Sequence, residues 1–176
     1  AAVGTAPYYI ESYTAGVNLV LKANPNYWQG KAKVTRSMPV GVVLTISAAG
    51  SETSSSAVLT NTETGKKCGI NTDFNRPAFA IMNPELTYTI PRRQLAAGIA
   101  DIMMHTLDRY ITHEEGNEFT DRVAEALLKN LIRFAKLAMT NHRDYQAMSE
   151  LMWCSSLSHN GLTGLGAAKD FTPHKL

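Results

Sequence analysis

Asp101 and His105 are the residues whose types and spacing most directly suggest chemistry. Four positions apart on a helix, their side chains lie on one face, one turn apart, and can reach a single cation. The alternative is an ordinary helix contact between a carboxylate and an imidazole. The flanking residues 98–100 and 102–104 are mostly apolar, which places the pair beside the buried stripe of the helix. The pair is therefore a candidate metal site.

His174 is the third candidate ligand, at the end of the segment 170–174, Asp-Phe-Thr-Pro-His. One carboxylate and two imidazoles suit a borderline divalent ion, zinc or ferrous iron, with an open position for water or substrate. The other histidines stand near predicted helix ends. We expect His113 and His142 to be solvated or to cap helices. His159 could face the metal region, but helix-end capping is the preferred interpretation.

The elements that must position this pair are helical. A helix is predicted over residues 92–112, because apolar residues recur there at steps of three and four after Pro91. Two further helices are predicted over 117–139 and 144–160.

Short strands precede the helices. A β-hairpin is predicted over 8–23, and the continuous apolar run 40–46 is typical of a strand buried on both faces of a sheet. Further strands are expected at 57–60, 67–70 and 79–82. The sequence thus predicts an α+β fold, with short strands and a hairpin in the N-terminal half and an antiparallel helical bundle in the C-terminal half. Three segments are expected: 1–38, 39–91 and 92–176.

Composition limits the function classes. The chain has 176 residues, of which 44% are hydrophobic and 18% charged, with a net charge of +2. With so small a net charge, we expect no electrostatic attraction to nucleic acid or to a membrane surface. No apolar run is long enough to span a bilayer. No export signal is visible. Cys68 and Cys154 could form one disulfide, but we expect two buried free thiols and a cytoplasmic location.

Four segments together resemble a known family: 39–52 (PVGVVLTISAAGSE), 83–91 (NPELTYTIP), 98–105 (GIADIMMH) and 152–174 (MWCSSLSHNGL…DFTPH). In this order and spacing they are similar to the iron-containing alcohol dehydrogenases, especially the NADP-dependent butanol dehydrogenase and aldehyde reductase branch. The resemblance implies oxidation of a small alcohol or reduction of an aldehyde, with a divalent metal (iron or zinc) and NADP as cofactors.

The resemblance also implies two sets of site residues. Three of the family's four metal ligands align with Asp101, His105 and His174. The nicotinamide end of the cofactor is implied to lie near Thr45, Gly50, Ser51 and Glu52, and its ribose or phosphate near Lys67.

Two family features have no counterpart in the sequence: a fourth ligand, which is a histidine beyond the position of His174, and the glycine-rich pyrophosphate loop. Without that loop, cofactor binding loses its main anchor. The expectation is an incomplete oxidoreductase module, weakly active or inactive alone.

The alternative is a non-catalytic, self-associating fusion or shuffled protein. Residues 1–34 support it, because the segments 4–8 and 19–31 (LVLKANPNYWQGK) resemble peptide-type solute-binding proteins of ABC importers. In either case the apolar stripes along 95–110 and 119–137 predict a homo-oligomer.

Overall fold

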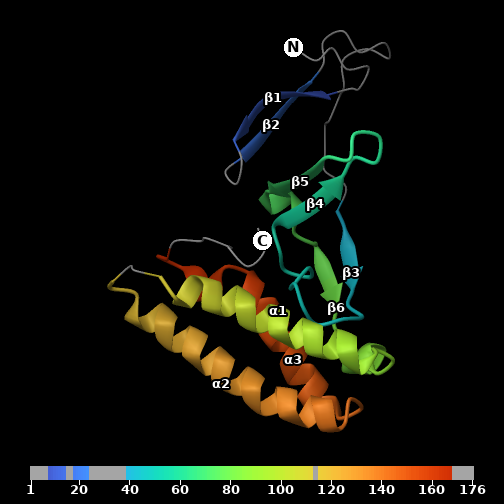
Figure 1. Cartoon of the computed structure of the whole chain (residues 1–176), viewed down its shortest axis with the longest axis vertical. Coiled ribbons are helices and arrows are strands. Elements are labelled where there is room, and N and C mark those ends of the chain that lie inside the picture. Colours follow the sequence, from blue (N-terminus) through green and yellow to red (C-terminus); the bar gives the residue numbers. More distant parts are fainter. Residues whose placement is uncertain (1–7, 15–17, 24–38, 113–114, 168–176) are drawn as a thin grey trace. The chain divides into compact units, whose positions relative to one another are not determined.

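The computed structural model describes residues 8–14, 18–23, 39–112 and 115–167 (Figure 1). They fall into two compact units, which we describe separately. The strand unit comprises the described residues within 1–39 and 56–75, and the helical unit those within 40–55 and 76–176. This division joins residues 56–75 to the N-terminal hairpin, whereas the three predicted segments follow chain order. The segment that contains His174 lies outside the described residues.

The strand unit is built from two antiparallel pairs. β1 (Tyr8–Thr14) pairs with β2 (Asn18–Ala23), which confirms the predicted hairpin. β4 (Ser56–Thr60) pairs with β5 (Lys67–Asn71), and the turn between them contains Gly65 at φ +66°. That positive φ suits a residue without a Cβ atom. The short helix η1 (Asp73–Asn75) follows β5.

The helical unit begins with a parallel pair, β3 (Gly41–Val43) and β6 (Phe79–Ile81). The prediction that 40–46 is buried on both faces is wrong, because Val40, Val43 and Ile46 are 54%, 55% and 40% exposed. Burial on both faces requires flanking strands and covering layers. Within the described residues β3 has one partner strand, and of the run 40–46 only Leu44 is buried.

Three helices make up most of the helical unit. After η2 (Pro84–Thr87), the chain forms α1 (Arg92–Tyr110), α2 (Glu118–Thr140) and α3 (Tyr145–His159), and then η3 (Leu162–Gly164). Each α-helix lies within two residues of its prediction, and successive helices run in opposite directions (Figure 1). Asp144 caps α3 by accepting a hydrogen bond from the backbone N–H of Ala147 at 2.8 Å. The predicted α+β architecture is confirmed.

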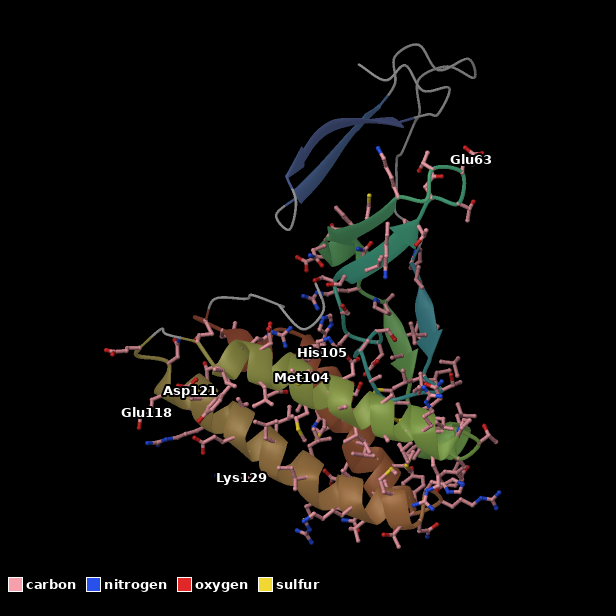
Figure 2. All side chains as sticks on the ribbon, in the orientation of Figure 1. Glu63, Met104, His105, Glu118, Asp121 and Lys129 are labelled. Carbon is pink, nitrogen blue, oxygen red and sulfur yellow. The ribbon has the colours of Figure 1, made fainter. Side chains whose placement is uncertain are left out.

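The helices share one apolar core. Its fully buried members come from all three helices and include Ile102, Leu131 and Leu151. The charged residues Glu118 and Lys129 lie on the side of α2 that faces away from α1 (Figure 2). Most apolar residues of the two stripes that predicted a partner chain lie in this core, together with residues of α3, whereas Phe119 and Leu137 are exposed. No helix in the described ranges has the length and hydrophobicity needed to cross a membrane.

Candidate metal site

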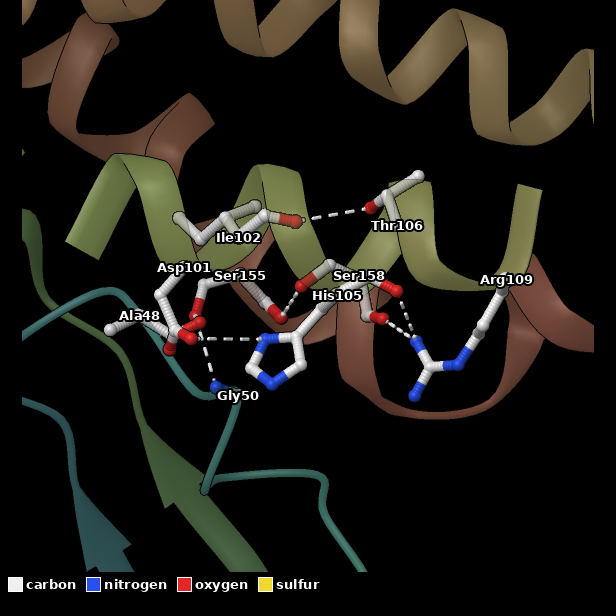
Figure 3. A network of polar contacts seen from close by, with 9 residues as sticks. All are labelled: Ala48, Gly50, Asp101, Ile102, His105, Thr106, Arg109, Ser155 and Ser158. Carbon is white, nitrogen blue, oxygen red and sulfur yellow. Dashed lines mark hydrogen bonds and ion pairs between the residues drawn. The ribbon is translucent and has the colours of Figure 1, made fainter. Parts of the chain in front are cut away.

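Helix α1 brings Asp101 and His105 together, as their spacing predicts (Figure 3). The Nδ1 atom of His105 lies 3.8 Å from Oδ1 of Asp101, which is an ion-pair distance and too long for a hydrogen bond. The His105 side chain is 5% exposed and the Asp101 side chain 30%. The pair thus sits at the edge of the core, with the carboxylate toward solvent.

Helix α3 places a second imidazole against His105. The ring centroids of His105 and His159 are 4.5 Å apart, and the ring planes are tilted by 50°. His159 is the last residue of α3, as the helix-end interpretation predicts, and its ring also faces His105.

The loop of residues 47–53 packs between α1 and α3. The N–H of Gly50 donates to Oγ of Ser155 at 3.2 Å, and that hydroxyl donates to the carbonyl of Ala48 at 3.2 Å (Figure 3). Gly50 has φ +60°, and a Cβ atom there would lie 2.7 Å from the Ser155 carbonyl oxygen and 2.9 Å from Cβ of His159. Glycine is therefore required at position 50 both for its backbone conformation and for the close approach to α3.

Three further contacts fix this loop. A Cβ atom on Gly98 of α1 would lie 2.3 Å from the carbonyl oxygen of Ser47, so the helix and the loop are in backbone contact. Glu52 is buried, and its Oε1 accepts a hydrogen bond from Oγ of Ser156 on α3. Thr53 donates to the Ser156 carbonyl at 3.1 Å. The loop is thereby held on both helices.

Arg109 is a buried residue of this network that was not predicted from the sequence. Its Nη1 donates to the carbonyl of Ser158 on α3 and to that of His105 at 3.3 Å (Figure 3). Burial lowers the pKa of Arg109, and the charge of Asp108 raises it. The sequence pattern that could have indicated it is the spacing of four residues from Asp101 to His105 and from His105 to Arg109. This spacing places all three polar side chains on one face of α1.

The predicted site residues are only partly brought together. Asp101 and His105 meet on α1, whereas His174 lies outside the described residues. Thr45 and Ser51 are exposed on the connection that contains Gly50, and the Gly50 N–H is used inside the protein. Lys67 is exposed in β5 of the strand unit. The nucleotide-binding residues stay a prediction.

The donor chemistry of the pair fits a divalent cation. A carboxylate oxygen and an imidazole nitrogen are ligands that zinc and ferrous iron accept. Across the described residues, no three His, Cys, Asp or Glu side chains are grouped to hold a metal ion. The described part thus supplies two predicted ligands. Its cysteines are free thiols, as predicted, but only Cys154 is buried, whereas Cys68 is half-buried in β5. Burial raises the pKa of Cys154.

Sequence comparisons give a consistent group of relatives. The family model for iron-containing alcohol dehydrogenases matches residues 13–84. The chain is 43% identical over 145 residues to NADH-dependent butanol dehydrogenase A of Clostridium acetobutylicum, covering 82% of this chain and 37% of that protein. It is 35% identical over 147 residues to the NADPH-dependent aldehyde reductase YqhD of Escherichia coli, covering 84% and 38%. The resemblance of residues 1–34 to solute-binding proteins stays a prediction.

Solved structures agree with the sequences. The crystal structure of E. coli K-12 YqhD superposes with a TM-score of 0.75 at 34% identity, over 83% of this chain and 37% of that one. NADH-dependent butanol dehydrogenase A from Thermotoga maritima gives a TM-score of 0.71 at 27% identity, over 79% and 35%. The chain therefore spans less than two fifths of the length of these relatives.

Proposed function

Because the chain is related to the iron-containing alcohol dehydrogenases in both sequence and fold, we propose that it forms part of the metal site of an NAD(P)-linked alcohol or aldehyde oxidoreductase. The relatives named above are butanol dehydrogenases and an aldehyde reductase. A small alcohol or aldehyde is accordingly the proposed substrate, and NADP the proposed nucleotide.

The observation that carries this proposal is the Asp101–His105 pair. Its two donor groups lie 3.8 Å apart, on the side of α1 that faces the 47–53 loop. With His174 as a third ligand, the set would hold iron or zinc. A divalent ion held there would supply Lewis-acid activation of a substrate oxygen, and a nicotinamide cofactor would supply the hydride chemistry.

The loop residues have distinct proposed roles. Thr45 and Ser51 present exposed hydroxyl groups on the same connection as Gly50, which suits contact with a nicotinamide nucleotide. Gly50 shapes the loop by letting it approach α3. Lys67 is proposed to contact the ribose or phosphate of the nucleotide. A chain that spans about two fifths of its relatives supplies only part of such a site, so we propose weak or absent turnover by this chain alone.

Zinc binding to the purified chain tests the proposal, measured by isothermal titration calorimetry with NADPH oxidation by butanal assayed in parallel. We expect weak binding that His105→Ala abolishes and that His174→Ala reduces less, because His105 is held on a helix. The matched control is His142→Ala, which removes a histidine from the turn between α2 and α3. Zinc affinity that is insensitive to both Asp101→Ala and His105→Ala would refute the proposal.

A homo-oligomer is the proposed assembly. The apolar side chains of Val43, Phe79 and Ile81 on the β3–β6 pair are more than half exposed. Exposed apolar area of this kind favours association with a second copy. Light scattering that gives the mass of a folded monomer at micromolar concentration would exclude it.

A further inference from the structure

We propose that His159 is a positioning residue, which holds the imidazole of His105 in one rotamer beside Asp101. The consequence for metal affinity rests on the proposed metal site, whereas the positioning itself is a property of the metal-free chain.

The contacts of His105 define its orientation. Asp101 lies one turn earlier on α1, with its Oδ1 3.8 Å from Nδ1 of His105. The His159 ring approaches from α3 at a centroid distance of 4.5 Å and a tilt of 50°. Aromatic rings at this separation attract each other beyond their apolar burial, and tilted arrangements are among the favoured ones. A ring confined between a helix turn and a second ring loses rotamer freedom.

His159 is itself held firmly enough to act as a support. The absence of a Cβ atom at Gly50 leaves room for Cβ of His159, since the two would otherwise be 2.9 Å apart. One turn earlier on α3, Ser155 accepts the Gly50 N–H at 3.2 Å. The carbonyl of Ser158, directly before His159, accepts a hydrogen bond from Arg109 of α1. The last turn of α3 is thus tied to the loop and to α1.

A positioning role accounts for the geometry better than a ligand role. Among the described residues, no three metal-ligating side chains are grouped so that they could hold a metal ion. Asp101, His105 and His159 therefore do not form such a group. His159 therefore acts on a cation through His105. Hydrogen-bonded residues that orient a metal-bound histidine typically change metal affinity by about 10- to 100-fold, and a ring contact should act at the lower end of that range.

The test compares His159→Ala with His159→Phe, because phenylalanine keeps an aromatic ring and lacks nitrogen ligands. In the metal-free chain, the NMR signals of the His105 imidazole should shift and average between rotamers in His159→Ala, and keep a single conformation in His159→Phe. In zinc titrations, His159→Ala should bind about tenfold more weakly. His159→Phe and the control His142→Ala should match the parent. If His159→Ala fails to fold, His159→Leu replaces it as the variant without an aromatic face.

Three results would overturn the proposal. One is a His105 ring signal unchanged in His159→Ala, and another is a His159→Phe variant that behaves like His159→Ala in the NMR experiment. The third is complete loss of zinc binding in both variants, equal to that of His105→Ala, which would make His159 a ligand. If the parent binds no zinc, the proposed function fails, and the NMR comparison in the metal-free chain still decides the positioning role.

Discussion

The three-helix core and the β3–β6 pair belong to the same unit, yet they differ in how far they bury their apolar residues. In the helices, Ile102, Leu131 and Leu151 are fully buried. In the strands, Val43 and Phe79 are more than half exposed. Successive antiparallel helices pack against neighbours in the chain, whereas parallel strands need partners and covering layers contributed by distant segments. Within the helical unit, the apolar residues are therefore more fully buried in the helices than in the β3–β6 pair.

The candidate site residues lie on elements that differ in burial in the same way. Asp101, His105 and His159 are carried by α1 and α3, whose buried apolar residues belong to one shared core. Thr45 lies on the connection that leaves β3, at the exposed strand pair. The candidate metal pair therefore lies on well-buried helices, whereas Thr45, predicted to contact the nucleotide, lies next to an exposed strand pair.

The largest expected effect on stability comes from a substitution in the helical core. Leu131→Ala should lower the free energy of unfolding by about 2–5 kcal/mol, because it leaves a cavity at a fully buried position of α2. Leu137→Ala is the matched control on the same helix, where the side chain is 46% exposed, and Val43→Ala probes the strand pair. Both should cost less than about 1 kcal/mol. Urea unfolding followed by circular dichroism measures all three.

A loss in Val43→Ala equal to that in Leu131→Ala would contradict the comparison. It would show that the strand pair is covered in solution, for example by a second copy of the chain.

The next effect tests the contact between helix and loop. Alanine in place of a helical glycine ordinarily stabilises a helix by about 1 kcal/mol. In Gly98→Ala the new Cβ atom would lie 2.3 Å from the Ser47 carbonyl oxygen, so we expect a net destabilisation of about 1–3 kcal/mol. The control is Gly69→Ala in β5, where a Cβ atom has no neighbour within 4 Å. Thermal unfolding of the two variants decides the sign, and a stabilised Gly98→Ala chain would show that the loop does not pack on α1.

Local patterns predicted the helices and the Asp101–His105 pair, because both follow from a period of 3.6 residues within one segment. The role of His159 was not predictable in the same way. Its position against His105 depends on how α3 packs across α1 and on the room left by Gly50, which are contacts between segments far apart in sequence. The burial of 40–46 was mispredicted for a related reason, since an apolar run indicates the capacity for burial and not the presence of covering layers.

The smallest expected effect concerns a surface link between α1 and α2. Glu125 accepts hydrogen bonds from Nζ of Lys129 and Oη of Tyr110, both at 3.1 Å. The hydrogen bond from Lys129 is the largest cause that lowers the pKa of Glu125, and the hydrogen bond from Tyr110 is the second. The hydrogen bond to Glu125 also raises the pKa of Tyr110. A carboxylate whose pKa is lowered by folding stabilises the protein above its usual value of 4.5, and this contribution is lost as the pH falls through the folded-state pKa.

Glu125→Gln should therefore be less stable than the parent at neutral pH, and the difference should shrink as the solution is acidified. The effect is small because Lys129 lies on the exposed side of α2, where salt screens the interaction (Figure 2). Lys129→Met should remove the larger part of the same pH dependence, and the double variant should remove little more than Glu125→Gln. Urea titrations at a series of pH values measure this, and a difference that grows toward acid would show that the link does not stabilise the helical core.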